Sequence, residues 1–571
     1  MSPMHRMTRS IEGARVAAPF QGESLRLGGD RATLEMHRGA RFVRVDSDAL
    51  RPSLFRVTRV LGGRHREDFV GVQVATEEDE ATSPRGDELV LPVSYLIEKK
   101  RLRYKGYSVM VRERPRLAAG PVWNRTCAFC HNTVPLLSTL LGALAGPRAS
   151  RYQGEVVDRL LPEAATFRYD VTDEGALDAA LSREIVRLGA VPPAVRSAGL
   201  VRHALEITRD RFDGSKLLEV GIGCEACHGG CREHVDTPTV HPSLVPRAPY
   251  LQVRTGAPDD APASASSDAE THACARCHQV LFSRYPWTWE GGRRNAMPGG
   301  SHISSGEARD LLLGGCRGAL KCTACHDPHS ADETLHLAAL ATVAGNTVCL
   351  SCHGALASKE ALRAHAHHDP EGAGGACIAC HMARKNMSLD GGLSRYHRIG
   401  SPSDPQRVLN DRPLECALCH VDKTVEQLAG TMERWWSKAY DRDALRSSYG
   451  DLGDNALRAT LRRGKPHERA VAMFVLGTAR DRLAAPLFGL ELFDEYPLVR
   501  QYAADALRAT FGDSCDVDVS QDRATLAEAI SRCSRAAGVP IPGALPPGSP
   551  ALPGSARPGG GSRGEGEPVE D

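Results

Sequence analysis

The stretch Cys322-Thr323-Ala324-Cys325-His326, followed directly by Asp327-Pro328-His329, is the clearest copy of the pattern that organises this chain. The pattern reads C-x-x-C-H, and its seven copies are Cys127, Cys130 and His131; Cys224, Cys227 and His228; Cys274, Cys277 and His278; Cys322, Cys325 and His326; Cys349, Cys352 and His353; Cys377, Cys380 and His381; and Cys416, Cys419 and His420. Two cysteines on one helical turn can form thioethers with the vinyl groups of a haem, while the adjoining histidine binds its iron. The sequence therefore predicts seven covalently attached haem c groups.

Two other interpretations of paired cysteines explain less of the pattern. Fourteen of the 18 cysteines lie in the seven motifs. Zinc knuckles also use C-x-x-C, but zinc needs four ligands per ion and gives no reason for a histidine after every second cysteine. Thioredoxin-like dithiols require neither the repetition nor that histidine.

The length and composition favour a chain of several parts in which haem fills much of the interior. The 571 residues suggest roughly two to four domains. Only 5% of residues are aromatic, and there are 55 glycines and 36 prolines, so we expect a thin apolar core over much of the length. The predicted fold class is mainly α, with low regular secondary structure in a multihaem core, a small N-terminal β region and a C-terminal α-helical repeat region.

The charge balance does not favour a nucleic-acid partner, and the hydropathy does not favour a membrane-spanning segment. The chain has 71 basic and 70 acidic residues, which gives no electrostatic reason to expect nucleic acid. It contains no run of 18 apolar residues, so no membrane span is expected. Thioether attachment takes place outside the bacterial cytoplasmic membrane, yet residues 1–20 lack the apolar segment of an export signal. We therefore expect a periplasmic or other extracytoplasmic location and a truncated N-terminus. The missing piece would carry an export signal and could carry an eighth motif; an authentic cytoplasmic start is the alternative.

Four segments follow from the distribution of motifs and periodicity. They are a small β-rich region at 1–118, a seven-haem cytochrome c core at 119–425 with a helical insert at 150–212, a HEAT-like helical region at 426–537, and a disordered Pro/Gly/Ser tail at 538–571. Alternating Val70, Val72 and Val74 indicate strands in the first segment. The helical insert rests on apolar residues at helical spacing, such as Leu177, Leu181 and Ile185.

The HEAT-like interpretation rests on a repeat of 31 residues. Arg469, Ala472 and Leu476 recur as Arg500, Ala503 and Leu507, and Pro466 and Pro497 open the two predicted helices. An unrelated helical bundle is the alternative. Four cysteines lie outside the motifs, and in an oxidising compartment Cys515 could pair with Cys533 and Cys231 with Cys316.

The second axial position of each iron needs another ligand or stays open. Seven of the 22 histidines belong to motifs, which leaves 22 minus 7, or 15, for the opposite face. The Asp327-Pro328 turn should direct His329 toward a haem other than its own. The predicted distal ligands are His234, His302, His329, His368 and His397, with His5 as a weaker candidate. Of the cluster His365, His367 and His368, we expect one ligand, His368.

Several of these segments resemble a known family. Gly223 to Gly230 with its C-E-A-C-H-G core, Cys322 to His329, and Cys377 to Met382 with His397 downstream are similar to periplasmic multihaem c-type cytochromes of the cytochrome c554 and doubled C-x-x-C-H type. The likeness covers roughly residues 120–425. It implies stacked haems whose distal histidines come from elsewhere in the chain, which supports His234, His329, His368 and His397. Pentahaem nitrite reductases differ, because their catalytic motif is C-x-x-C-K and all seven motifs here end in histidine.

Three functions are compatible with this sequence. The first is electron transfer through mostly bis-histidine haems between a quinol-linked donor and a terminal acceptor, with other redox proteins as partners and no catalytic residue. The second is a multihaem oxidoreductase of small nitrogen or sulfur compounds, with one open five-coordinate haem. In the third, the helical repeats form a protein-docking surface and the haems act as a sensor.

Overall fold

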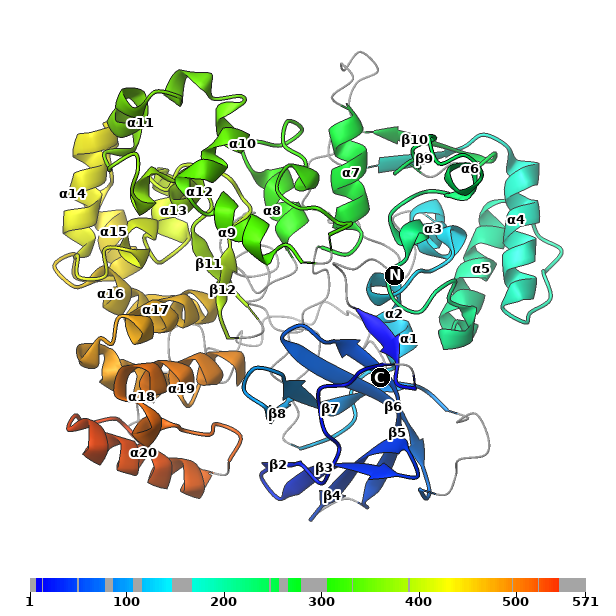
Figure 1. Ribbon diagram of the computed structural model, residues 1–571, viewed down its shortest axis with the longest axis horizontal. Helices are drawn as coiled ribbons and strands as arrows, with labels where there is room; N and C mark the ends of the chain where they lie inside the picture. Colours follow the sequence, from blue (N-terminus) through cyan, green and yellow to red (C-terminus); the bar gives the residue numbers. More distant parts are fainter. Residues whose placement is uncertain are drawn as a thin grey trace, which may run out of the picture.

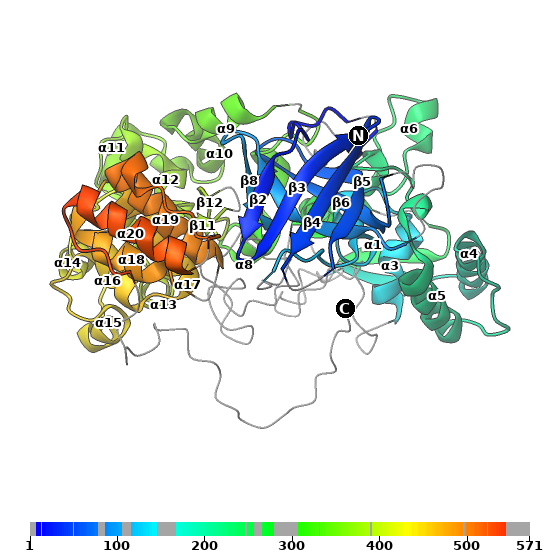
Figure 2. The same ribbon diagram turned by 90° about the horizontal axis from the view of Figure 1, so that it is seen from below.

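The computed structural model describes residues 7–12, 14–48, 51–77, 86–105, 116–145, 167–245, 248–255, 265–278, 306–330, 332–388, 391–494, 497–521 and 523–543. Its N-terminal part is an antiparallel sheet, its central part holds the seven motifs, and its C-terminal part is helical (Figure 1). Seen from below, the sheet lies between the C-terminal helices and the pair α4 and α5 (Figure 2). No helix among these residues is both long and apolar enough to cross a membrane.

The N-terminal sheet has eight strands. They are β1 (Thr8–Ser10), β2 (Ser24–Leu27), β3 (Asp30–His37), β4 (Ala40–Ser47), β5 (Ser53–Gly62), β6 (Arg66–Val74), β7 (Leu89–Leu96) and β8 (Arg101–Tyr104). Strands β2 to β8 pair in sequence order, and β1 pairs with β5. The sheet curls until β2 lies against β8. Its inner face buries alternating apolar residues, including Leu34, Val43, Phe55 and Phe69.

The expected mainly α fold with a small β region is therefore wrong. The strands enclose an apolar interior of their own rather than forming a small cap on the first haems. The composition suggested a thin apolar core because it averages over the whole chain. The buried apolar side chains are instead concentrated in this sheet and in the C-terminal helices. A curled sheet whose interior is filled by its own side chains needs no cofactor to complete its core.

The first motif and the segment after it form the next layer. The elements are α1 (Trp123–Thr126), α2 (Ala128–His131), α3 (Leu136–Ala145), β9 (Phe167–Val171), α4 (Glu174–Arg187), α5 (Ala198–Arg211), η3 (Gly214–Lys216), η4 (Cys224–Ala226), α6 (Arg232–Asp236) and β10 (Leu251–Thr255). Strands β9 and β10 pair antiparallel. Leu177, Leu181 and Ile185 are buried against α3 and α5, as their spacing predicts.

From the third motif onward, short helices alternate with turns. They are α7 (Ala265–Ala275), α8 (Glu307–Leu313), η5 (Cys322–Ala324), α9 (Thr334–Leu340), η6 (Val343–Gly345), α10 (Asn346–Leu350), η7 (Gly354–Leu356), α11 (Lys359–Ala366), η8 (Ala373–Gly375), α12 (Cys377–His381), α13 (Pro405–Asn410) and η9 (Glu415–Leu418). One hairpin, β11 (Arg384–Met387) and β12 (Leu393–Arg395), packs against α17.

The C-terminal helices form a stack at one side of the molecule (Figure 1). They are α14 (Val425–Trp436), α15 (Arg442–Tyr449), α16 (Ala456–Arg463), α17 (Pro466–Thr478), η10 (Arg482–Ala484), α18 (Ala485–Glu491), α19 (Pro497–Phe511), η11 (Asp513–Cys515) and α20 (Arg523–Ala537). Helices α17 and α19 begin at the two predicted prolines and pack against each other. The disulfide Cys515–Cys533 is present, whereas Cys231 and Cys316 are free thiols. The HEAT-type relationship stays a prediction.

A buried ion pair stabilises the outer face of the sheet. Asp68 lies opposite Ser94 on β7, and the Lys105 ammonium group contacts the Asp68 carboxylate. Arg66 is the second cation, 3.4 Å from that carboxylate. Burial alone raises the pKa of Asp68, but Arg66 and Lys105 outweigh burial and lower it well below its usual value. The carboxylate therefore stabilises the fold at neutral pH and loses that contribution as the pH falls through its folded pKa.

Replacing Lys105 with methionine should destabilise the sheet by about 3–5 kcal/mol, because Asp68 would keep a buried charge with one cation removed. Urea denaturation of the wild type and the variant at neutral pH measures the difference. Lys99 is the matched control, since its pair with Asp505 at 3.5 Å is partly exposed, and Lys99→Met should cost about 1 kcal/mol or less. Equal losses of unfolding free energy in the two variants would show that the buried pair contributes no more to stability than the partly exposed pair.

Candidate haem-binding site

Each motif forms a single turn that places its cysteines and histidine close together. In six motifs the backbone N–H of the histidine donates to the carbonyl of the first cysteine at 2.9 to 3.1 Å, and the seventh, Cys377–His381, is the helix α12. This i to i+4 hydrogen bond is that of an α-helical turn. The geometry lets both thiols and the imidazole of one motif face the same ligand.

Four motif histidines each face a second histidine ring. The pairs are His228 and His329, with ring centres 6.3 Å apart and planes at 2°; His326 and His397, at 6.4 Å and 25°; His381 and His365, at 5.9 Å and 14°; and His420 and His368, at 5.9 Å and 39°. In each pair one ring comes from a motif and the other from a distant segment or a different motif's flank. The second rings therefore lie where distal ligands would be needed.

These spacings fit an iron atom between the rings. A metal–imidazole nitrogen bond is about 2.0 Å, and each bonded nitrogen lies about 1.1 Å from its ring centre, so two axial imidazoles place their ring centres roughly 6 Å apart. Two imidazole rings in direct van der Waals stacking could place their ring centres closer together than these roughly 6 Å. The rings of the four pairs fit two axial ligands of one haem.

In several of the paired histidines, the Nδ1 atom already has a hydrogen-bond partner within the protein. The Nδ1 of His381 donates to the Gly400 carbonyl at 2.9 Å, that of His368 to the Ala366 carbonyl at 2.6 Å, and that of His397 to the Arg395 carbonyl at 3.0 Å. The Nδ1 of His326 lies 3.2 Å from the Glu333 carboxylate. Hydrogen bonding at Nδ1 orients a ring and leaves Nε2 for the metal, as in most metal-binding histidines.

The predicted distal residues have different surroundings in the structure. His329, His368 and His397 each face a motif histidine. The ring that faces His228 is that of His329, whereas the Nδ1 of His234 donates to the Val240 carbonyl at 2.8 Å. His5 and His302 lie outside the described residues.

The cluster at 365–368 provides two facing rings, where the sequence predicted one. Helix α11 ends at Ala366, and His367 follows in the left-handed conformation with φ 54°. This reversal separates His365, which faces His381, from His368, which faces His420. His367 instead stacks on Trp435 at 4.8 Å. A cue for His365 was its position in the last turn of a helix that ends beside the sixth motif, but the reversal at His367 is not readable from the sequence.

Glycine is required beside His368. A Cβ on Gly374 would lie 2.6 Å from Cδ2 of the His368 ring. No side chain fits there unless the ring moves. The absence of a side chain at Gly374 therefore leaves the space that the His368 ring occupies.

Neighbouring motifs touch one another. The Cys130 thiol donates to the Arg276 carbonyl of the third motif at 3.8 Å. Interaction with Cys130 lowers the pKa of Cys277 to about 6, and interaction with Cys274 lowers the pKa of Cys322 to about 7. Cys349 and Cys377 form a third such contact. Arg276, inside the third motif, donates to the Ala226 carbonyl of the second motif. These contacts join the first four motifs to one another and the fifth motif to the sixth.

Motif one lies against the outer face of the sheet. Its Ala128 and the preceding Trp123 pack on Leu61, Val70 and Val90. Burial lowers the pKa of His131 to about 4, and the nearby Lys105 contributes in the same direction. The same sheet face therefore brings a cationic side chain into electrostatic range of a motif histidine.

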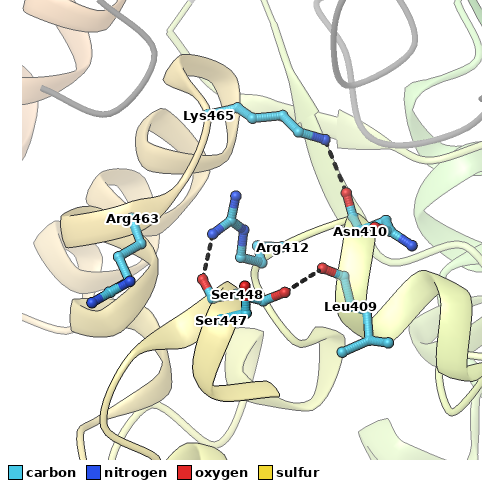
Figure 3. Close-up of a pocket in the computed structure, with 7 residues that line it drawn as sticks. All are labelled: Leu409, Asn410, Arg412, Ser447, Ser448, Arg463 and Lys465. Carbon is cyan, nitrogen blue, oxygen red and sulfur yellow. Dashed lines mark hydrogen bonds between the residues drawn. The ribbon is translucent and has the colours of Figure 1, made fainter. Parts of the chain in front are cut away.

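A polar cavity lies beside the segment that leads into the seventh motif (Figure 3). Its volume is about 370 Å³, and its lining residues are Leu409, Asn410, Arg412, Ser447, Ser448, Arg463 and Lys465. Lys465 donates to the Asn410 carbonyl at 3.0 Å, and Arg412 pairs with the buried Glu468. Of the three cations in the lining, Arg412 is thus paired with a carboxylate and Lys465 is hydrogen-bonded to a backbone carbonyl. The lining residues include no motif histidine.

Residues 317–358 match the family described as the doubled CXXCH motif. This span contains the motifs at Cys322 and Cys349. No curated protein and no solved structure matches the chain. The motifs and this match indicate covalent haem c binding and support a c-type cytochrome with more than one haem.

Proposed function

We propose that this chain is an extracytoplasmic multihaem c-type cytochrome that relays electrons through seven covalently bound haems, most of them with two histidine ligands. The observation that carries the proposal is the set of four histidine pairs whose ring centres lie 5.9 to 6.4 Å apart. Iron bound between two imidazoles can accept and release one electron without exchanging a ligand. The haem supplies this redox chemistry, and the protein supplies its attachment, orientation and surroundings.

The contacts between motifs support a relay with a defined order. Thiol contacts join the first motif to the third, the third to the fourth, and the fifth to the sixth. Burial and the nearby Cys349 of the fifth motif raise the pKa of Cys325 in the fourth. Burial and the nearby Cys380 of the sixth motif raise the pKa of Cys416 in the seventh to about 12. These neighbours would connect the fourth motif to the fifth and the sixth to the seventh. The second motif joins the cluster as a branch, through Arg276 and through His329.

The other parts of the proposal concern location and partners. A quinol-linked donor and a terminal acceptor would exchange electrons at the two ends of the relay. The C-terminal helices, with their HEAT-like pattern, would serve as a protein-docking surface. Thioether attachment requires the chain to reach the periplasm or an equivalent compartment.

Mass spectrometry of the exported protein tests the haem count. We expect intact mass to show seven haem additions, and peptide mapping to place one on each C-x-x-C-H segment. Replacing both Cys322 and Cys325 with serine should remove one haem and leave the others. Changing Cys231 to serine is the control, because this cysteine is a free thiol outside the motifs and its loss should leave the count unchanged. Exported protein without covalent haem would end the proposal.

A reductase of small nitrogen or sulfur compounds is the second candidate. This function would need an open haem with a cation beside it to hold an oxyanion, and Lys105 and Arg66 lie within electrostatic range of His131, where the Asp68 carboxylate already pairs with both. Carbon monoxide separates the two functions. If the spectrum of the reduced protein does not change with the gas, no iron is open and the reductase function is excluded.

A further inference from the structure

One paired motif histidine has a carboxylate as its hydrogen-bond partner. The Nδ1 of His326 lies 3.2 Å from Oε2 of Glu333, whose side chain is only 2% exposed. The other oxygen of Glu333 accepts a hydrogen bond from the Asp327 backbone N–H. The carboxylate is therefore buried and fixed against the ring by the same short segment that carries the histidine.

The corresponding contacts at the two following paired sites are neutral. The Nδ1 of His381 donates to the Gly400 carbonyl, and the Nδ1 of His368, which faces His420, donates to the Ala366 carbonyl. The ring opposite His326, that of His397, also donates to a carbonyl. A carbonyl contributes a dipole, whereas the Glu333 carboxylate contributes a full negative charge from a side chain that is itself buried.

We propose that Glu333 is a positioning residue that gives the haem at Cys322 and Cys325 a lower reduction potential than the haems at Cys377 and Cys416. This inference rests on the proposed function. A carboxylate that accepts the Nδ1 proton makes the imidazole a stronger electron donor and so favours the ferric over the ferrous iron. The one-electron reduction of this haem therefore becomes less favourable.

The fourth motif lies in the middle of the cluster, so a lower reduction potential there would affect electron transfer through the relay. The fourth motif contacts the third through Cys274 and Cys322, and the Nδ1 of His278 in the third motif lies 3.5 Å from the Glu307 carboxylate. Two neighbouring motifs in the middle of the cluster thus each have an acidic partner. An electron that crosses the relay would meet its least favourable sites in the middle.

The test is a spectroelectrochemical titration of the haem-loaded protein and of its Glu333→Gln variant. Glutamine keeps the size and an oxygen acceptor but removes the charge. We expect one component of the titration to shift to higher potential, and the electron paramagnetic resonance signal of one low-spin ferric haem to change with it. Glu270→Gln is the matched control, because Glu270 accepts hydrogen bonds from the Thr323 N–H and hydroxyl of the same motif but contacts no histidine ring of that motif.

A second variant keeps the test decisive if the glutamine variant loads haem poorly. Glu333→Asp retains the charge at a greater distance, so its shift should be in the same direction and smaller. An unchanged titration in either fully loaded variant overturns the role of Glu333. Haem content by mass spectrometry separates this result from a failure of the proposed function: full loading with unchanged potentials refutes only the tuning, whereas a wild type without haem refutes the relay itself.

Discussion

Replacing His365 with asparagine should open one haem to carbon monoxide, whereas the same replacement at His367 should not. The His365 ring faces His381 at 5.9 Å and 14°, so its loss would remove the second ligand from the sixth motif's iron. His367 stacks on Trp435, and its Nε2 lies 3.2 Å from the Trp435 carbonyl. The measurement is the difference spectrum of the reduced protein with and without the gas, together with the high-spin ferric signal.

Asparagine is chosen for both positions for a reason of backbone geometry. His367 has φ 54°, a conformation that asparagine tolerates better than alanine does. The backbone at His365 stays anchored because Trp436 donates its indole N–H to the His365 carbonyl at 2.8 Å. If the His367 variant bound the gas and the His365 variant did not, the assignment of the two rings would have to be exchanged.

Replacing Arg469 with methionine should cost about 3–5 kcal/mol of folding free energy or more, because two buried carboxylates would lose their cation. Arg469 is 1% exposed, and its guanidinium lies 2.9 Å from Glu491 and also contacts Asp494. It donates a further hydrogen bond to the Gly464 carbonyl at 2.9 Å. Burial raises the pKa of Glu491 to about 7 even with Arg469 present. Chemical denaturation followed by circular dichroism would measure the loss.

The pH dependence and a control make this prediction specific. Without Arg469 the pKa of Glu491 should rise above its wild-type value of about 7, so the difference from the wild type should shrink as the pH falls below about 7 and Glu491 becomes neutral in both proteins. Arg458 pairs with Asp481 at 2.7 Å, but its side chain is 25% exposed, and Arg458→Met should cost about 1 kcal/mol or less. A loss in Arg469→Met as small as in this control would contradict the importance of the buried cluster.

The sequence predicted local features better than those that depend on distant contacts. The C-x-x-C-H motifs, the helix starts at Pro466 and Pro497 and the disulfide between Cys515 and Cys533 are all short-range patterns or simple pairings, and the structure contains the helices and the disulfide. The eight-stranded sheet was underestimated, because alternation identifies single strands but not how many of them close on one interior.

The distal histidines show the same limit. The turn at Asp327-Pro328 predicted that His329 would be directed away from its own motif, and in the structure its ring faces that of His228, about 100 residues away in the chain. His365 and His368 face different motifs because one left-handed residue lies between them. Arg469 was noted only as part of a repeat, since nothing in the sequence indicates that Glu491 and Asp494 converge on it.

The segment from His326 to His329 belongs to two ring pairs at once. His326 faces His397 and His329 faces His228, while the Asp327 carboxylate accepts the His329 backbone N–H at 2.9 Å. In the loaded protein these four residues would be a short spacer between two irons. Because only two residues separate the two histidines, a displacement of one iron would be transmitted along the backbone to the other.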